Sequence, residues 1–112
     1  EILLGQLRTG HVVLNDYLHR FPFVRGATPA NCTFCPVPET VQHLIIDCWF
    51  HHIIRKPLLF AVTSALTIPP SEVTLQHILG STPTSAAHYD KIKPALLRFL
   101  RATHRFRSIQ LR

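Results

Sequence analysis

The sequence predicts a mostly α-helical fold, a small helical domain built around a hairpin of three cysteines and one histidine. Apolar residues recur at helical spacing through most of the chain, and no segment alternates long enough to indicate a β-sheet. The cysteines and histidine follow the pattern C-x2-C-x7-H-x4-C. With 112 residues, we expect a single domain that buries roughly two-thirds of its unfolded surface.

The pattern is formed by Cys32, Cys35, His43 and Cys48. Two thiolates on a tight turn, followed by an imidazole and a third thiolate from the next element, are the ligands of a tetrahedral structural Zn²⁺ site. Four protein ligands leave no coordination position for substrate or water. We therefore expect a zinc hairpin at residues 31–48, in which the metal organises the chain and performs no chemistry.

Other interpretations of these residues stay open. A CxxC pair can be a redox centre, but such a pair usually lies beside a βαβ pattern, which is not visible here. Three cysteines cannot all form disulfides within one chain. Free or oxidised thiols are the remaining alternative, although buried free thiols do not explain the spacing. Among the ligands, His51 and His52 lie just past Cys48 and are candidates to replace His43.

In the N-terminal part, we expect residues 1–20 to be a helical segment that precedes the zinc hairpin. We expect helices at residues 1–8 and 12–20, separated at Gly10, which suits the left-handed conformation at a helix end. Prolines and a glycine indicate a loop over residues 21–31.

A helix is expected to follow the cysteine turn, with Pro38 and Glu39 in its first turn. Its buried face is an i, i+3, i+4 stripe of Val41, Leu44 and Ile45. His43 and Cys48 are five residues apart, about 140° around an α-helix. Both side chains can reach one ion only if the helix loosens at its end.

A helical remainder is expected over residues 49–108. A longer helix at 49–67 is kinked or divided at Pro57 and stopped by two further prolines. Ser71 is expected to cap a short helix that runs through residue 79, and a turn follows. The last helix spans about residues 85–108 and is broken or begun at Pro94.

The charge of the chain is strongly positive. Twelve Lys and Arg face six Asp and Glu, which gives a net charge of +6 and a pI near 9.9. This balance favours a polyanionic partner, above all nucleic acid, although a basic solubilising surface is the common alternative. Charged residues make up only 16% of the chain, against about 25% in typical domains. We therefore also expect exposed apolar surface that another domain covers.

The terminal helix separates apolar from basic residues. Its core-facing stripe is formed by Ile92, Leu96, Phe99, Leu100, Thr103 and Phe106. Arg98, Arg101 and Arg105 lie on the opposite side with Lys91 near them, and Arg107 extends the basic character. No acidic residue follows Asp90, so we predict a phosphate-facing surface at Arg98, Arg101, Arg105 and Arg107.

The sequence does not predict an enzyme. Its six acidic residues are scattered, whereas a two-metal nuclease needs clustered carboxylates. No GxSxG, P-loop or GxGxxG motif occurs. A small hydrolase that pairs a zinc-free cysteine with His51 or His52 is a disfavoured alternative. No membrane partner is expected, because the most apolar run, 58–68, is too short to span a bilayer.

Three segments carry a family resemblance. Residues 7–20, LRTGHVVLNDYLHR, resemble a stretch that follows the ribonuclease H domain in non-LTR retrotransposon polyproteins. The CxxC pair with ETVQHLIIDC, residues 39–48, resembles the zinc-binding (CCHC) motif of their reverse transcriptases. Residues 99–106, FLRATHRF, are similar to the close of fungal versions, except that His104 stands where glycine is usual.

The resemblance implies a C-terminal segment of a retrotransposon polyprotein, with a reverse transcriptase and often a ribonuclease H upstream. It implies zinc at the four ligands and a role in holding template RNA or target DNA, in an intracellular and nuclear protein. The alternative is a zinc-stapled docking domain that packs on the upstream reverse transcriptase or ribonuclease H domain. Affinity that depends steeply on salt would separate nucleic-acid binding from docking.

Overall fold

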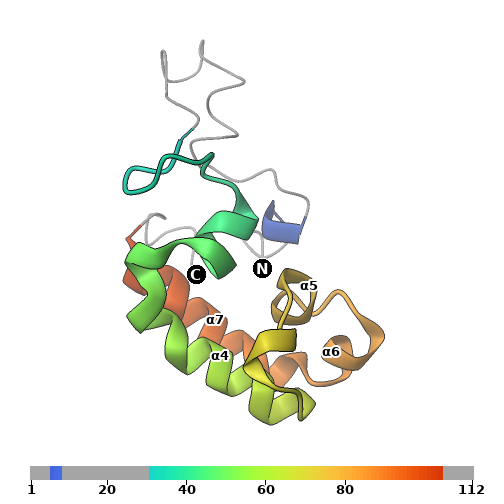
Figure 1. The fold of residues 1–112 in the computed structure, drawn as a ribbon. Helices are drawn as coiled ribbons and strands as arrows, with labels where there is room; N and C mark the ends of the chain where they lie inside the picture. Colours follow the sequence, from blue (N-terminus) through green and yellow to red (C-terminus); the bar gives the residue numbers. More distant parts are fainter. Residues whose placement is uncertain (1–5, 9–30, 105–112) are drawn as a thin grey trace. The chain divides into compact units, whose positions relative to one another are not determined.

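The computed structural model describes residues 6–8 and 31–104 (Figure 1). Gln6 to Arg8 are helical, and Leu7 is buried. The helix predicted at 12–20 and the loop predicted at 21–31 lie outside the described residues, apart from Asn31. So do the end of the last predicted helix and two of the predicted phosphate ligands, Arg105 and Arg107.

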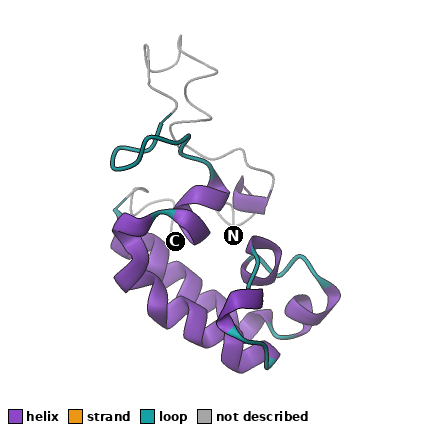
Figure 2. Ribbon diagram, viewed as in Figure 1, coloured by secondary structure: helices purple, strands orange, loops and turns teal. Residues whose placement is uncertain are grey.

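The described part of the chain is mostly helical and contains no strand, which confirms the predicted fold class (Figure 2). The chain divides into two compact units, Glu1–Phe50 and His51–Arg112. The division falls two residues after the predicted end of the zinc hairpin. Whether the two units act as one domain stays a prediction. None of the described helices is long and apolar enough to cross a membrane.

The first unit contains a hairpin loop followed by a short helical segment. The loop is closed by an antiparallel bridge between Asn31 and Pro38. The helical segment covers residues 41–47, and its second part is the π-helix η1, His43–Asp47. The predicted apolar stripe is buried, as expected: Val41, Leu44 and Ile45. The 3₁₀ turn η2, Trp49–His51, follows.

The start of this helical segment differs from the prediction. Pro38 is not in a first helical turn, because its backbone is held in the bridge to Asn31. Thr40 performs the capping instead. Its hydroxyl oxygen accepts a hydrogen bond of 3.1 Å from the His43 amide, and its carbonyl accepts one of 3.0 Å from the Leu44 amide.

The second unit is organised by two fifteen-residue helices that pack against each other, α4 (His52–Leu66) and α7 (Tyr89–Thr103). In Figure 1 they lie side by side, with the short helices α5 (Leu75–Ile78) and α6 (Pro83–Ala87) at one end. Leu58 and Val62 of α4 are fully buried. The described members of the predicted stripe on α7 are also buried, with 7% exposure at most: Ile92, Leu96, Phe99, Leu100 and Thr103.

The predicted helix at 49–67 begins later than expected and is continuous. Residues 49–51 form the 3₁₀ turn, and α4 begins at His52 and runs through Pro57 without a break. Thr67 ends it in the left-handed conformation, with a φ of 56°.

The C-terminal helices also differ from the prediction. Thr74, not Ser71, caps α5, because its hydroxyl and the His77 side chain form a reciprocal pair of bonds with the backbone. In the described part of the predicted helix at 85–108, which ends at residue 104, the chain forms two helices, α6 and α7, separated at His88. Pro94 lies inside α7 and does not break it.

Candidate metal centre

The first arm of the centre is the turn that carries Cys32 and Cys35. The Cys32 amide donates a hydrogen bond of 2.8 Å to the carbonyl of Val37, which closes the loop around both cysteines. Inside the loop, the Phe34 amide donates to Cys32 Sγ at 3.4 Å. A donor aimed at sulfur stabilises the negatively charged thiolate, which is the form that binds a metal.

The second arm is the helical segment that carries His43 and Cys48. The Cys48 amide donates to the carbonyl of His43 at 2.6 Å, a bond across five residues. This bond is π-helical, so the turn is wider than in an α-helix. The helix therefore loosens where the sequence requires it, and the two ligands reach the same point.

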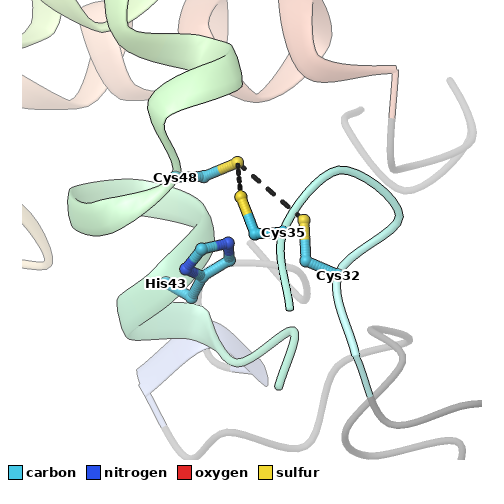
Figure 3. A group of neighbouring side chains, drawn as sticks. All are labelled: Cys32, Cys35, His43 and Cys48. Carbon is cyan, nitrogen blue, oxygen red and sulfur yellow. Dashed lines mark hydrogen bonds between the residues drawn. The ribbon is translucent and has the colours of Figure 1, made fainter. Parts of the chain in front are cut away.

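The two arms bring the four predicted ligands together (Figure 3). Their ligand atoms all lie within 4.8 Å of one another. Cys48 Sγ is 3.9 Å from Cys32 Sγ and 3.8 Å from Cys35 Sγ. These separations are far longer than a disulfide bond of about 2.05 Å, and all three thiols are free. The group can hold a metal ion, and within residues 6–8 and 31–104 no other cluster of three or more such residues does so.

Burial of these ligands supports metal binding. Cys48 is fully buried, and His43 is only 7% exposed. His43 Nε2 is buried and has no hydrogen-bond partner among the described residues. An unpaired buried polar atom costs about 1–3 kcal/mol, which a metal–nitrogen bond at the imidazole would offset. The donor set of three thiols and one imidazole thus fits a metal ion.

The two alternative histidine ligands are not part of this group. His51 is buried in the second unit, where its ring meets Phe99 edge-on at 6.3 Å between centroids. The guanidinium of Arg55 lies 5.8 Å from the centre of the same Phe99 ring. His52 is exposed in the first turn of α4. His43 is therefore the imidazole that the fold presents to the three sulfurs.

Two of the four predicted phosphate ligands are described, Arg98 and Arg101. Both are exposed on α7, as is Lys91. At 100° per residue, these three side chains fall within about 80° of one another, away from the buried stripe. Asp90, in the first turn, is the single acidic residue of α7.

An aromatic cluster that was not predicted from the sequence lies beside the candidate metal ligands. The rings of Phe34 and Phe50 are stacked, with centroids 3.6 Å apart and planes 5° apart. Trp49 meets Phe50 edge-on at 6.1 Å. The three side chains are 42%, 49% and 64% exposed, for Phe34, Phe50 and Trp49 respectively. The sequence positions of these residues could have predicted the cluster. Phe34 lies between two of the candidate ligands, and Trp49 and Phe50 directly follow the last one.

Comparisons of the chain with protein-family models, with curated proteins and with solved structures give no match. Function is therefore inferred from the chemistry of the side chains and from the sequence resemblance.

Proposed function

We propose that the Cys3His group binds one Zn²⁺ ion. A Zn–S bond is about 2.3 Å long, so two sulfurs of a tetrahedral site are separated by roughly 3.8 Å. Cys48 Sγ lies 3.8 Å from Cys35 Sγ and 3.9 Å from Cys32 Sγ, which matches this separation. Thiolates are soft ligands that select zinc over magnesium or calcium. Because all four positions are filled by protein, the ion stabilises the hairpin and the module is non-catalytic.

The module is a C-terminal segment of a retrotransposon reverse transcriptase. It binds the nucleic acid, template RNA or target DNA, on which that upstream enzyme acts. The resemblance of its motifs to non-LTR polyproteins supports the parent protein, and a nuclear location follows from that parentage. The observation that carries the binding proposal is the basic face of α7, defined by Lys91, Arg98 and Arg101. These cations are exposed on one side of a helix whose other side is anchored in the core.

Titration with RNA and DNA at several salt concentrations tests this proposal. Labelled single- and double-stranded oligonucleotides of the same sequence are added to the zinc-loaded chain, and binding is followed by fluorescence anisotropy. Each phosphate neutralised contributes about −0.7 to −0.9 to the slope of log affinity against log salt. With three cations on the basic face of α7, we expect a slope of about −2 or steeper. Affinity that is absent, or that does not change with salt, overturns the proposal.

A second candidate function is docking on the upstream reverse transcriptase or ribonuclease H domain. The exposed Phe34–Phe50 stack favours it, because stacked aromatic rings at a surface are typical anchors of protein interfaces. Association with the upstream domain, measured by calorimetry at low and high salt, distinguishes the two functions. Docking through aromatic rings predicts affinity that changes little with salt, and that falls when Phe34 and Phe50 are both replaced by alanine.

A further inference from the structure

An open pocket lies beside the metal centre, within the first unit. Its volume is about 460 Å³, inside the range of roughly 300–1,000 Å³ that is usual for small-ligand sites. The candidate metal ligands Cys35 and His43 contribute to one part of its lining. The other lining residues are Val37, Pro38, Thr40, Asp47 and Trp49. Asp47 is exposed and Trp49 is 64% exposed, so a carboxylate and an indole ring are both accessible there.

The segment that builds this pocket has a formal charge opposite to that of the whole chain, and Asp47 is the one acidic residue in the lining. Residues 31–50 contain two acids, Glu39 and Asp47, and no Lys or Arg, although the chain as a whole carries +6. A loaded centre adds to this local negative charge. One Zn²⁺ with three thiolates and a neutral imidazole has a net charge of −1, from +2 and −3. These formal charges favour a cationic ligand over a phosphate at the pocket.

We propose that this pocket binds the guanidinium group of an arginine in an extended segment of a partner protein. The Asp47 carboxylate supplies a charged acceptor that matches the planar guanidinium fork. The indole of Trp49 supplies a ring face for a cation–π contact. Val37, which is 40% exposed, and Pro38 supply apolar surface for the aliphatic stem of the arginine. Arginine is preferred over lysine, because it stacks on aromatic rings and binds carboxylates with two bonds.

The residues that line this pocket belong to the first unit, and none of them is a residue of the basic face of α7, so the inference does not depend on nucleic-acid binding. Trp49 is the single tryptophan of the chain, so its fluorescence reports on the pocket directly. The probe is the blocked peptide Ala-Ala-Arg-Ala-Ala, titrated into the zinc-loaded full chain. Analogues with lysine and with citrulline, the uncharged isostere of arginine, are the matched ligands. Backbone amide NMR shifts of residues 37–49 are followed in the same titration.

We expect saturable shifts at Val37, Asp47 and Trp49 with the arginine peptide, weaker binding of the lysine peptide and none of the citrulline peptide. Asp47→Asn should reduce affinity about fivefold, the effect of losing an exposed ion pair of about 1 kcal/mol. Asp90→Asn makes the same charge change on α7 and should leave affinity unchanged. Zinc content of both variants is measured, so that a loss of folding is recognised.

Three results would overturn the inference. Equal binding of the citrulline and arginine peptides would show that the pocket does not select a cation. Equal loss of affinity in Asp47→Asn and Asp90→Asn would show attraction by net charge alone. A single-stranded oligonucleotide that shifts the same resonances more strongly than the peptide would assign the aromatic surface to base stacking instead. Failure of the nucleic-acid proposal itself appears in the salt titration and leaves the peptide result unaffected.

Discussion

The backbone amide of Cys48 donates a 2.6 Å hydrogen bond to the carbonyl oxygen of His43, and this bond sets the spacing of the second pair of ligands. In an α-helix, residues five apart are rotated by about 140°. A π-helical bond instead joins residue i to residue i+5 and places both at one turn. The x4 spacing between histidine and cysteine is thus matched to a local π-helix, a feature that often occurs at functional sites.

Replacement of Cys35 by serine should abolish metal binding and unfold the hairpin. Cys35 is only half-buried and serine is smaller, so the effect comes from the lost ligand and not from a clash. Structural zinc in finger peptides contributes roughly 10–16 kcal/mol and is coupled to folding. Zinc per chain is measured by elemental analysis, and folding by circular dichroism.

His52→Ala, a change at an exposed histidine outside the group, is the control. Full zinc content and an unchanged melting curve in Cys35→Ser would contradict the prediction.

Exchange of single histidines should distinguish the ligand from its neighbours. His43→Ala leaves three thiols, and we expect metal affinity to fall by more than the roughly 10–100-fold that loss of an outer-shell partner costs. His51→Ala removes the edge-on contact with Phe99 and should lower stability while the metal content stays at one ion per chain. Substitution with Co²⁺ gives an absorption spectrum that reports on the ligand set of each variant. An unchanged spectrum in His43→Ala, with a changed spectrum in His51→Ala, would contradict the prediction and identify His51 as the ligand.

The metal group was predictable because ligand chemistry restricts both residue type and spacing. Three thiols and an imidazole must converge within a few ångströms, so their order in the sequence already constrains the fold. The prediction even required a loosened helix between His43 and Cys48, which the π-helical bond supplies. In the same way, burial on one side of α7 followed from the spacing of Ile92, Leu96 and Phe99.

Helix starts were less predictable, because several residues near each start are suitable caps. Pro38 and Ser71 match the statistical preferences for helix starts, yet Thr40 and Thr74 form the capping bonds. At α6, Thr82 and Ser85 hydrogen-bond to each other's backbone amides, so the helix begins at Pro83, two residues before the predicted start at residue 85. Such reciprocal bonds depend on the path of the chain before the helix, which periodicity does not encode. The exposed pair Phe34 and Phe50 was missed because aromatic residues ordinarily indicate a core.

Gly80 should not tolerate a side chain. Its φ of 70° lies in the left-handed region, and a Cβ atom there would stand 2.7 Å from Cδ1 of Tyr89. Gly80→Ala combines backbone strain with a steric clash against a half-buried ring at the start of α7. We expect a loss of about 1–3 kcal/mol in the free energy of unfolding, measured by urea denaturation of the zinc-loaded chain.

Thr67→Gly is the matched opposite of this change. Thr67 adopts a φ of 56° at the end of α4, and a β-branched residue is strained there. Glycine relieves the strain, so we expect stability to rise by up to about 1 kcal/mol. The predictions would be contradicted if Gly80→Ala did not change the free energy of unfolding and Thr67→Gly lowered it. Strain in the left-handed conformation would then not determine stability at either turn.

Alanine at Arg98 and Arg101 should weaken nucleic-acid binding with little effect on folding. Both side chains are exposed on α7, while Phe99 and Leu100 between them remain in the core. Each replacement removes one phosphate contact, so the double variant should reduce the steepness of the salt slope by about 1.4 to 1.8. Lys56→Ala, an exposed cation on α4, is compared with each single arginine variant. Net charge alone predicts equal losses for Lys56→Ala and Arg98→Ala, whereas a binding surface on α7 predicts a larger loss for the arginine. Unchanged affinity in the double variant, with an unchanged melting temperature, would show that nucleic acid does not bind this face of α7.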